Sequence, residues 1–307
     1  MEKRQSAAHR LAEELYAAME RGVAPWQKTW DSLGAGASAF RPRNLVTGHH
    51  YRGGNFFNLA SQSSAMDWGG DWVTFNQAKK LGGHVRRGEK ATLIIKRLNL
   101  KDGGELDDRG SSEGEDKTKK PRLVFVGDAL FNVAQVEGLP TMESSGTTEI
   151  PVVDGAEAIL AALLADGMGY HEPSPDGKAF YRPSADKTYM PARACFATPY
   201  DFYATLMHEF GHATMGNNRV PRDVTNYATE ELRAEMAATL TCSALGLPRL
   251  ADQLENHAAY LESWLREFAE KKHKLVSVAS EAQRIADWLI ARAGNVTATQ
   301  RDEAVEA

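Results

Sequence analysis

Three residues in the segment LMHEFGHATM have the types and spacing of a metal-dependent hydrolase. His208 and His212 are four positions apart, and Glu209 follows the first histidine directly. On a helix, residues four apart share one face, so both imidazoles can reach one metal ion from the same side. The neighbouring glutamate can then approach a water molecule in the open position of the metal. The segment predicts a metal site with Glu209 as its general base.

Two histidines alone bind zinc weakly, so a third protein ligand is needed. The segment ATEELRAEMAATLTCSALGLP predicts a second helix, beginning near residue 229, that carries Glu231 and Glu235 on one face. We assign Glu231 as the third ligand and Glu235 as the acid that orients a ligand imidazole. Glu230 is expected to point elsewhere. A single acid on a helix is usually solvated, but this spacing on an Ala-rich helix favours the metal site.

The elements that must position these residues are well marked. Thr198 is a suitable N-cap and Pro199 suits the first helical position, so the metal helix should begin there. Short β-prone runs before it, residues 180–182 and 187–190, predict a hairpin that could pair with an extended peptide. Other helices are expected at residues 6–21, 76–81, 156–165 (capped by Asp154), 250–272 and 275–293, and a strand at 91–98. Tyr189 and Tyr200 are candidates for holding an oxyanion.

Composition places the chain among ordinary globular proteins. It has 307 residues, of which 42% are hydrophobic and 25% charged. Two distant cysteines predict free thiols. The sequence shows no apolar leader and no apolar run long enough to span a membrane, so we expect a cytoplasmic protein. The net charge of −5 hides an asymmetry: residues 1–100 hold 15 basic and 8 acidic side chains, whereas the remainder holds 21 and 33. A basic front suggests a polyanion-binding module joined to a second unit.

The front segment mixes large aromatic rings with arginine and lysine. Bases stack on rings and cations neutralise phosphates, so this mixture suits single-stranded nucleic acid. The alternative is that the rings fill the core and the cations are merely solvated. The most concentrated positive cluster is Arg86, Arg87 and Lys90, on a turn before a strand. The expected architecture is α+β: a first domain at 1–140 with a disordered insertion at 101–120, a linker at 141–155, a mostly helical second domain with a small sheet at 156–295, and a flexible tail at 296–307.

Blocks in both halves resemble the ArdC-type antirestriction proteins of mobile elements such as conjugative plasmids and phages. They are PWQKTW, PRNLVTGHHYRGGNFFNL, WVTFNQAKKLGGHVRRGEKAT and LFNVAQVEGLP in front, and YATLMHEFGHATM and YATEELRAEMAA behind. The resemblance implies a domain that binds single-stranded DNA, fused to a zincin-like metallopeptidase domain that binds Zn²⁺ or another divalent metal such as Mn²⁺. It implies His208, His212 and Glu231 as ligands and Glu209 as the catalytic acid. Arg43, Asn44, Tyr51 and Arg52 match the block of the DNA-binding face, and we add Lys79 to these candidates.

The match departs from the family at one place. Relatives often continue the metal motif with Trp-Thr-Gly-His, where this chain has Ala213, Thr214, Met215 and Gly216. The resemblance implies protection of incoming DNA from host restriction. The sequence does not identify the protein or peptide substrate, for which the host restriction machinery is a candidate. Two other functions stay open. One is a purely DNA-binding shield with a structural metal. The other is a repair protease that removes proteins crosslinked to DNA.

Overall fold

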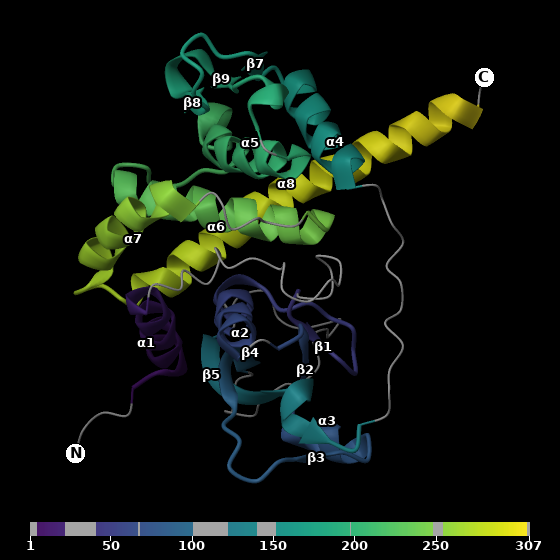
Figure 1. The fold of residues 1–307 in the computed structure, drawn as a ribbon, viewed down its shortest axis with the longest axis vertical. Helices are drawn as coiled ribbons and strands as arrows, with labels where there is room; N and C mark the ends of the chain where they lie inside the picture. Colours follow the sequence, from purple (N-terminus) through teal and green to yellow (C-terminus); the bar gives the residue numbers. More distant parts are fainter. Residues whose placement is uncertain are drawn as a thin grey trace.

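The computed structural model describes residues 5–21, 41–66, 68–100, 122–139, 152–196, 198–247 and 254–305 (Figure 1). Its helices are α1 (Ala7–Glu20), α2 (Gly53–Met66), α3 (Phe75–Lys80), α4 (Val152–Ala165), α5 (Pro199–Ala213), α6 (Tyr227–Leu245), α7 (Leu254–Phe268) and α8 (Lys274–Val305). Its strands are β1 (Arg43–Asn44), β2 (Asp71–Val73), β3 (His84–Val85), β4 (Thr92–Leu100), β5 (Arg122–Asn132), β6 (Val136–Glu137), β7 (Gly169–His171), β8 (Phe180–Arg182) and β9 (Lys187–Tyr189). None of the described helices is long and apolar enough to cross a membrane.

The N-terminal half is built on a four-stranded sheet of order β1-β2-β5-β4. The long strands β4 and β5 pair antiparallel over nine residue pairs, and β1 joins β2 in parallel. Helix α2 packs on β4 and buries Phe56 and Phe57 completely. Helix α3 begins with a capping box in which Thr74 and Gln77 satisfy each other's backbone N–H groups. Strands β3 and β6 form a separate two-stranded ladder beside α3.

The C-terminal half places helices around a three-stranded sheet of order β7-β9-β8. Helix α5 packs closely on α6. The approach is tightest at Gly211, where an added Cβ would lie only 3.2 Å from the Cα of Ala234. Glycine and alanine at this crossing bring the two helix axes together. That approach is what allows side chains of α5 and α6 to meet at one site. Helix α8 runs across the back of α4 and α6 (Figure 1).

One hydrophobic core joins the two halves. Leu11, Leu15 and Met19 on α1 are fully buried in the cluster that also contains the apolar faces of α5, α6 and α8. Helix α8 contacts α1 and α2 as well as α4 and α6. The Tyr16 hydroxyl donates a hydrogen bond to the carbonyl of Leu265 on α7. The α+β architecture expected from the sequence is confirmed.

Several sequence-based boundaries need correction. The first helix and the strand at β4 lie where they were expected, and both cysteines are free. Helix α4, however, begins at Val152, so the last residues of the expected linker are helical. Helix α8 continues through Val305, across most of the segment expected to be a flexible tail. The expected insertion at 101–120 and the rest of the linker, 141–151, lie outside the described residues, as does the PWQKTW block.

Candidate metal centre

Two well-capped helices present the candidate ligands. Thr198 caps α5 as predicted: its hydroxyl accepts a hydrogen bond from the backbone N–H of Asp201, whose carboxylate accepts from the N–H of Thr198. Asn226 caps α6 by accepting from the N–H of Thr229 at 2.8 Å. The caps fix where each helix starts. They therefore set which faces of α5 and α6 meet at their crossing.

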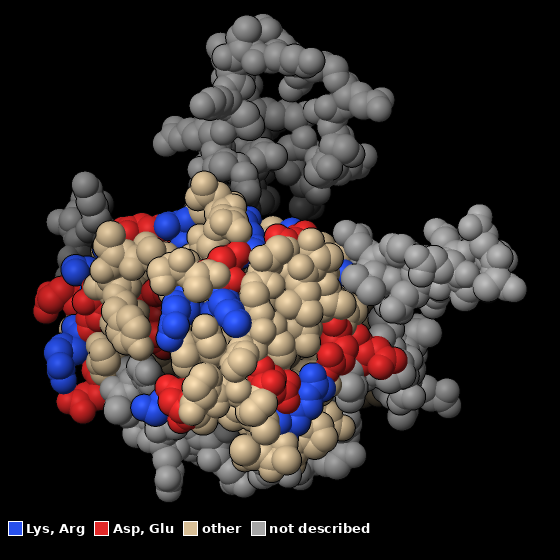
Figure 2. All heavy atoms as spheres, turned by 90° about the horizontal axis from the view of Figure 1, so that it is seen from above, with Lys and Arg blue, Asp and Glu red and all other residues tan. Residues whose placement is uncertain are grey.

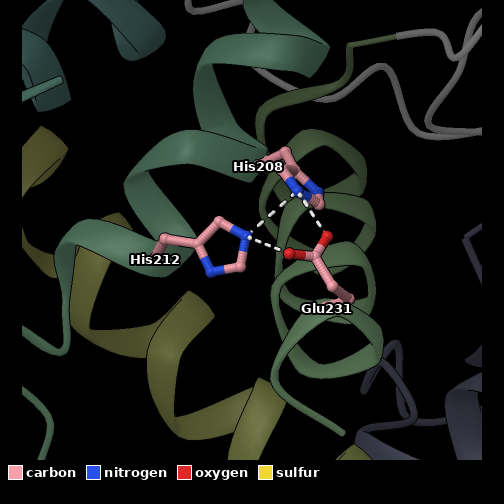
Figure 3. A group of neighbouring side chains, drawn as sticks. All are labelled: His208, His212 and Glu231. Carbon is pink, nitrogen blue, oxygen red and sulfur yellow. Dashed lines mark hydrogen bonds and ion pairs between the residues drawn. The ribbon is translucent and has the colours of Figure 1, made fainter. Parts of the chain in front are cut away.

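His208, His212 and Glu231 converge, and their side chains point toward one another from α5 and α6 (Figure 3). The two Nε2 atoms lie 3.2 Å apart, and the Glu231 oxygens lie 3.6 Å from His208 Nε2 and 3.5 Å from His212 Nε2. Donors about 2.0–2.1 Å from a tetrahedral zinc ion lie about 3.3–3.4 Å from each other. The spacing and the N, N, O donor set both fit a divalent metal held by three protein ligands.

Each imidazole is oriented by a separate glutamate on α6. Glu235 Oε2 lies 3.1 Å from His208 Nδ1, the arrangement predicted from the sequence. Glu230 Oε1 lies 3.4 Å from His212 Nδ1, so the expectation that Glu230 points elsewhere is wrong. Hydrogen bonding at Nδ1 leaves Nε2 of each ring as the free ligand atom. Both Nε2 atoms face Glu231, which makes the pair of rings a preformed chelate.

Glu230 belongs to a buried charged network that sequence reasoning missed. It pairs with Arg222 (Nη2–Oε1 2.6 Å) and with Arg233, whose side chains are only 1% and 4% exposed. Arg233 also binds Glu281 on α8 at 2.8 Å. Arg222 donates to the carbonyl of Gly211, so the network ties the end of α5 to α6 and α8. The available signal was three acids within the first turns of α6, with Arg222 before them and Arg233 among them.

The electrostatics of the cluster reflect the contact between acids and imidazoles. Burial lowers the pKa of His208, but hydrogen bonds to Glu231 and Glu235 outweigh it and raise that pKa well above its ordinary value. Burial raises the pKa of Glu231, yet contacts with both imidazoles bring it far below the ordinary value. Burial raises the pKa of Glu209. A carboxyl with a raised pKa is suited to accept and return a proton.

Glu209 lies beside the ligands and is anchored by the sheet. It is 7% exposed, and its carboxylate accepts a hydrogen bond from the backbone N–H of Tyr181 in β8. The Tyr181 hydroxyl donates to Asp186 Oδ1 at 2.7 Å, and Asp186 also holds the Arg219 guanidinium through two bonds of 2.6 and 2.7 Å. A Cβ at Gly216 would overlap this cluster. The cluster thus explains why glycine stands at position 216.

The two tyrosines considered for the oxyanion are not placed at the ligands. Tyr189 lies on the outward face of β9, where its ring stacks on Phe180 with centroids 4.6 Å apart. Tyr200 is in the first turn of α5, two turns before His208, and packs against the hydrophobic core. The prediction for Tyr189 is wrong, because β8 and β9 turn the alternate residues, Tyr181 and Thr188, toward α5.

Three of the DNA-binding candidates stabilise the fold around β1. The Arg43 Nε donates to Asp71 Oδ1 at 2.6 Å across the β1–β2 pair. Asn44 is buried, donates to the Tyr51 hydroxyl at 3.2 Å, and accepts from the backbone N–H groups of Val46 and Thr47. These contacts hold the turn of the PRNLVTGHHYRGG block in shape. The role of this block in binding nucleic acid stays a prediction.

The other five candidates are exposed. Arg52 pairs with Asp287 on α8 while its side chain is 58% exposed, and Arg86 pairs with Glu89 at 2.7 Å. Lys79, Arg87 and Lys90 are exposed side chains on α3 and on the turn between β3 and β4. Phe56, Phe57 and Trp72 are fully buried, so these rings of the front half belong to the core and not to a binding face.

Comparison with known proteins agrees with this two-part organisation. Residues 156–281 match a family described as zincin-like metallopeptidase, and residues 5–130 match the N-terminal domain of anti-restriction factor ArdC. Fold and candidate site together define a protein whose C-terminal half is a zincin-like metallopeptidase domain. The chain belongs to the ArdC family of antirestriction proteins.

Similar proteins are known both as structures and as sequences. The metal-free crystal structure of the antirestriction ArdC protein from the R388 plasmid superposes with a TM-score of 0.71 at 32% identity, covering 94% of this chain and 98% of that one. Its Mn(II)-bound structure matches with a TM-score of 0.68 at 31% identity, over the same shares. An uncharacterized protein, y4eC, of Sinorhizobium fredii is 31% identical over 303 residues, 96% of this chain and 94% of that protein. A DNA primase TraC of Escherichia coli is 34% identical over 298 residues, but this chain spans only 27% of its length.

Proposed function

We propose that this chain protects incoming DNA of a mobile element from host restriction. In this proposal its N-terminal half binds single-stranded DNA and its C-terminal half carries a metal-dependent peptidase site in the recipient cytoplasm. The observation that carries the proposal is the convergence of His208, His212 and Glu231, with Glu209 beside them, in a chain that aligns with ArdC over 94% of its length. The host restriction machinery is the candidate source of its protein or peptide substrate.

The metal in this proposal is zinc, with manganese as the alternative. Imidazole nitrogens and a carboxylate suit zinc, and three protein ligands leave a position open for substrate or water. The Mn(II)-bound form of the R388 protein favours testing manganese as well. When bound, the ion supplies Lewis acidity, which polarises a carbonyl oxygen and lowers the pKa of water.

The residues of the chain divide the remaining chemistry among them. Glu209 takes a proton from the attacking water and returns it to the leaving amine nitrogen. Its hydrogen bond from the Tyr181 N–H fixes the carboxylate beside the ligands. Glu235 and Glu230 keep both imidazoles turned toward Glu231. Strand β8 lies at the edge of its sheet, the position at which an extended substrate can add as a further strand.

For DNA, we propose contacts through Lys79, Arg86, Arg87 and Lys90, and through the block around β1. The cations near α3 and β3 are exposed, as phosphate contacts require. Within the block around β1, Arg52 is the best candidate for a phosphate contact, since its side chain is 58% exposed. Arg43 and Asn44 are engaged within the fold.

Plasmid-transfer efficiency into a restricting host tests the proposal. Wild type, Glu209→Gln and an Arg87→Gln/Lys90→Gln double variant are compared, with Arg266→Gln/Lys271→Gln as the charge-matched control. Loss of protection in both test variants supports a function that uses both halves. Protection that survives Glu209→Gln but not the loss of Arg87 and Lys90 identifies a DNA-binding shield. Peptide cleavage that requires single-stranded DNA and includes self-cleavage identifies a repair-type protease.

A further inference from the structure

The outward face of the β7-β9-β8 sheet carries a group of rings and cations that the metal centre does not use. Successive strand residues alternate between faces. In β8 and β9, Tyr181 and Thr188 point inward and are buried. The opposite face presents Phe180 and Arg182 from β8 and their direct partners, Tyr189 and Lys187, from β9. We call these four residues, together with His171 of β7, the outer platform.

The side chains of the outer platform contact one another closely. Phe180 and Tyr189 stack with centroids 4.6 Å apart and planes within 13°. The Arg182 guanidinium lies 5.4 Å from the Phe180 centroid and 5.0 Å from the Tyr189 centroid. Lys187 Nζ lies 5.2 Å from the Tyr189 centroid, and the His171 ring lies 5.7 Å from it.

Burial does not explain these rings. Phe180 and Tyr189 are partly exposed, and neither belongs to the hydrophobic clusters formed by the described residues. Tyr181, one position away, is in the main cluster. The side chain of Lys187 occupies the space beside the rings. Any Cβ at Gly169 would lie 2.9–3.2 Å from the stem of Lys187, so the glycine in β7 lets that lysine lie across the strand.

The charge of the outer platform is positive in a chain that is negative overall. Its outward positions are the rings of His171, Phe180 and Tyr189 and the cations Arg182 and Lys187, with no acid among them. Two nearby acids are engaged elsewhere. Asp186 holds Arg219 and Tyr181 on the inner side. Glu172 accepts from Tyr170 and contacts Arg193. Figure 2, which looks onto the molecule from above Figure 1, shows basic side chains near the middle of this face, with acidic side chains close by.

We propose that the outer platform is a second contact for single-stranded DNA, located in the zincin-like half. Bases stack on Phe180 and Tyr189 in place of Arg182, whose guanidinium moves to a phosphate, and Lys187 neutralises the next phosphate. The inference rests on the proposal that the chain binds single-stranded DNA. It adds a location, because β8 also contacts Glu209 through the Tyr181 N–H. A strand on the outer platform therefore lies across the sheet from the metal centre.

A peptide is a poorer fit to this face. An extended peptide recognises a sheet edge through backbone hydrogen bonds, and the edges of this sheet are β7 and β8. The outer platform lies on the face of the sheet and offers ring surfaces and point charges. Those groups match the two repeating features of a nucleic-acid strand, its bases and its phosphates.

The test is fluorescence anisotropy of labelled oligodeoxythymidylate with the whole chain, together with photo-crosslinking of an oligonucleotide carrying 5-iodo-2′-deoxyuridine. The variants are Phe180→Leu/Tyr189→Leu, which keep apolar bulk, and Arg182→Gln/Lys187→Gln. The charge control is Arg266→Gln/Lys271→Gln on and after α7, and thermal unfolding verifies that each variant is folded. We expect each platform variant to weaken binding about tenfold, the control to change it less than about twofold, and the crosslink to map to Phe180 or Tyr189.

The outcomes separate this inference from the proposed function. If the platform variants bind as wild type does, while Arg87→Gln/Lys90→Gln weakens binding and crosslinks map only before residue 140, the outer platform is not a DNA contact and the proposed function stands. If a platform variant instead alters only peptide cleavage, a peptide is the occupant and the inference is overturned. If wild type does not bind the oligonucleotide, both proposals fail.

Discussion

Replacing Glu230 tests whether this glutamate positions the metal centre. In Glu230→Gln the side chain keeps its size and loses its charge, so Arg222 and Arg233 keep buried guanidinium groups without their shared carboxylate. Both are almost fully buried, at 1% and 4% exposure. Removing one partner of a buried ion pair costs about 3–5 kcal/mol. The acid that orients His212 Nδ1 is also lost, and such changes reduce metal affinity by about 10–100-fold.

Two measurements separate these effects. Urea denaturation of chelator-treated protein gives the free energy of unfolding without a contribution from metal binding. Competition with a chromogenic chelator gives the zinc affinity of the folded protein. Glu157→Gln is the matched control, because it also removes a carboxylate from an arginine, but at a surface where Arg193 is 46% exposed. We expect the control to cost no more than about 1 kcal/mol and to leave zinc affinity unchanged.

If folded Glu230→Gln binds zinc within about twofold of wild type, Glu230 does not position the metal centre. In that case the 3.4 Å contact between Glu230 and His212 does not orient the imidazole. A loss of stability below about 1 kcal/mol would refute the buried-network argument separately.

Three further predictions follow from the site and its surroundings. Glu209→Gln should retain metal, measured by atomic absorption, while any peptide hydrolysis falls by at least about 100-fold; full activity in the variant would remove its assigned role. The Arg219 guanidinium lowers the pKa of Asp186, so this carboxylate stabilises the fold above its ordinary pKa and that contribution is lost as pH falls through the lowered value. Asp186→Asn should therefore cost about 1–3 kcal/mol in urea denaturation at pH 7 and less at pH 3.5; an equal loss at both values would contradict the linkage. Arg87→Gln/Lys90→Gln should reduce the slope of log K against log salt for single-stranded DNA by about 1.4, and an unchanged slope would place phosphate contacts elsewhere.

The metal centre was largely predictable because it depends on helical periodicity. His208 and His212 on one helix, and Glu231 and Glu235 on another, each need only a four-residue repeat to share a face. What the repeat cannot supply is the angle at which the two helices cross. That angle brings Glu230, one position before Glu231, within reach of Nδ1 of His212. A residue expected to point elsewhere is therefore part of the site.

The front half was less predictable because its ion pairs join distant segments. Arg43 finds Asp71 only because β1 lies beside β2 in parallel, and Arg52 finds Asp287 across 235 positions. From the sequence alone, both arginines were expected to be available to DNA phosphates. The folded chain holds Arg43 within the sheet and leaves the exposed charge on α3 and the β3–β4 turn. Charge counts indicate the kind of partner, whereas pairing determines which cations can meet it.

The two halves cannot be treated as independent units, because α8 is shared between them. On one side Asp287 pairs with Arg52, and Gln283 accepts a hydrogen bond from the backbone N–H of Gly53 at the start of α2. On the other side Glu281 holds Arg233, which binds the glutamate that orients His212. Helix α1 buries its apolar face in the same core as α5 and α6. A truncation between the halves would expose that core, so point variants of the whole chain are the sound way to separate DNA binding from metal chemistry.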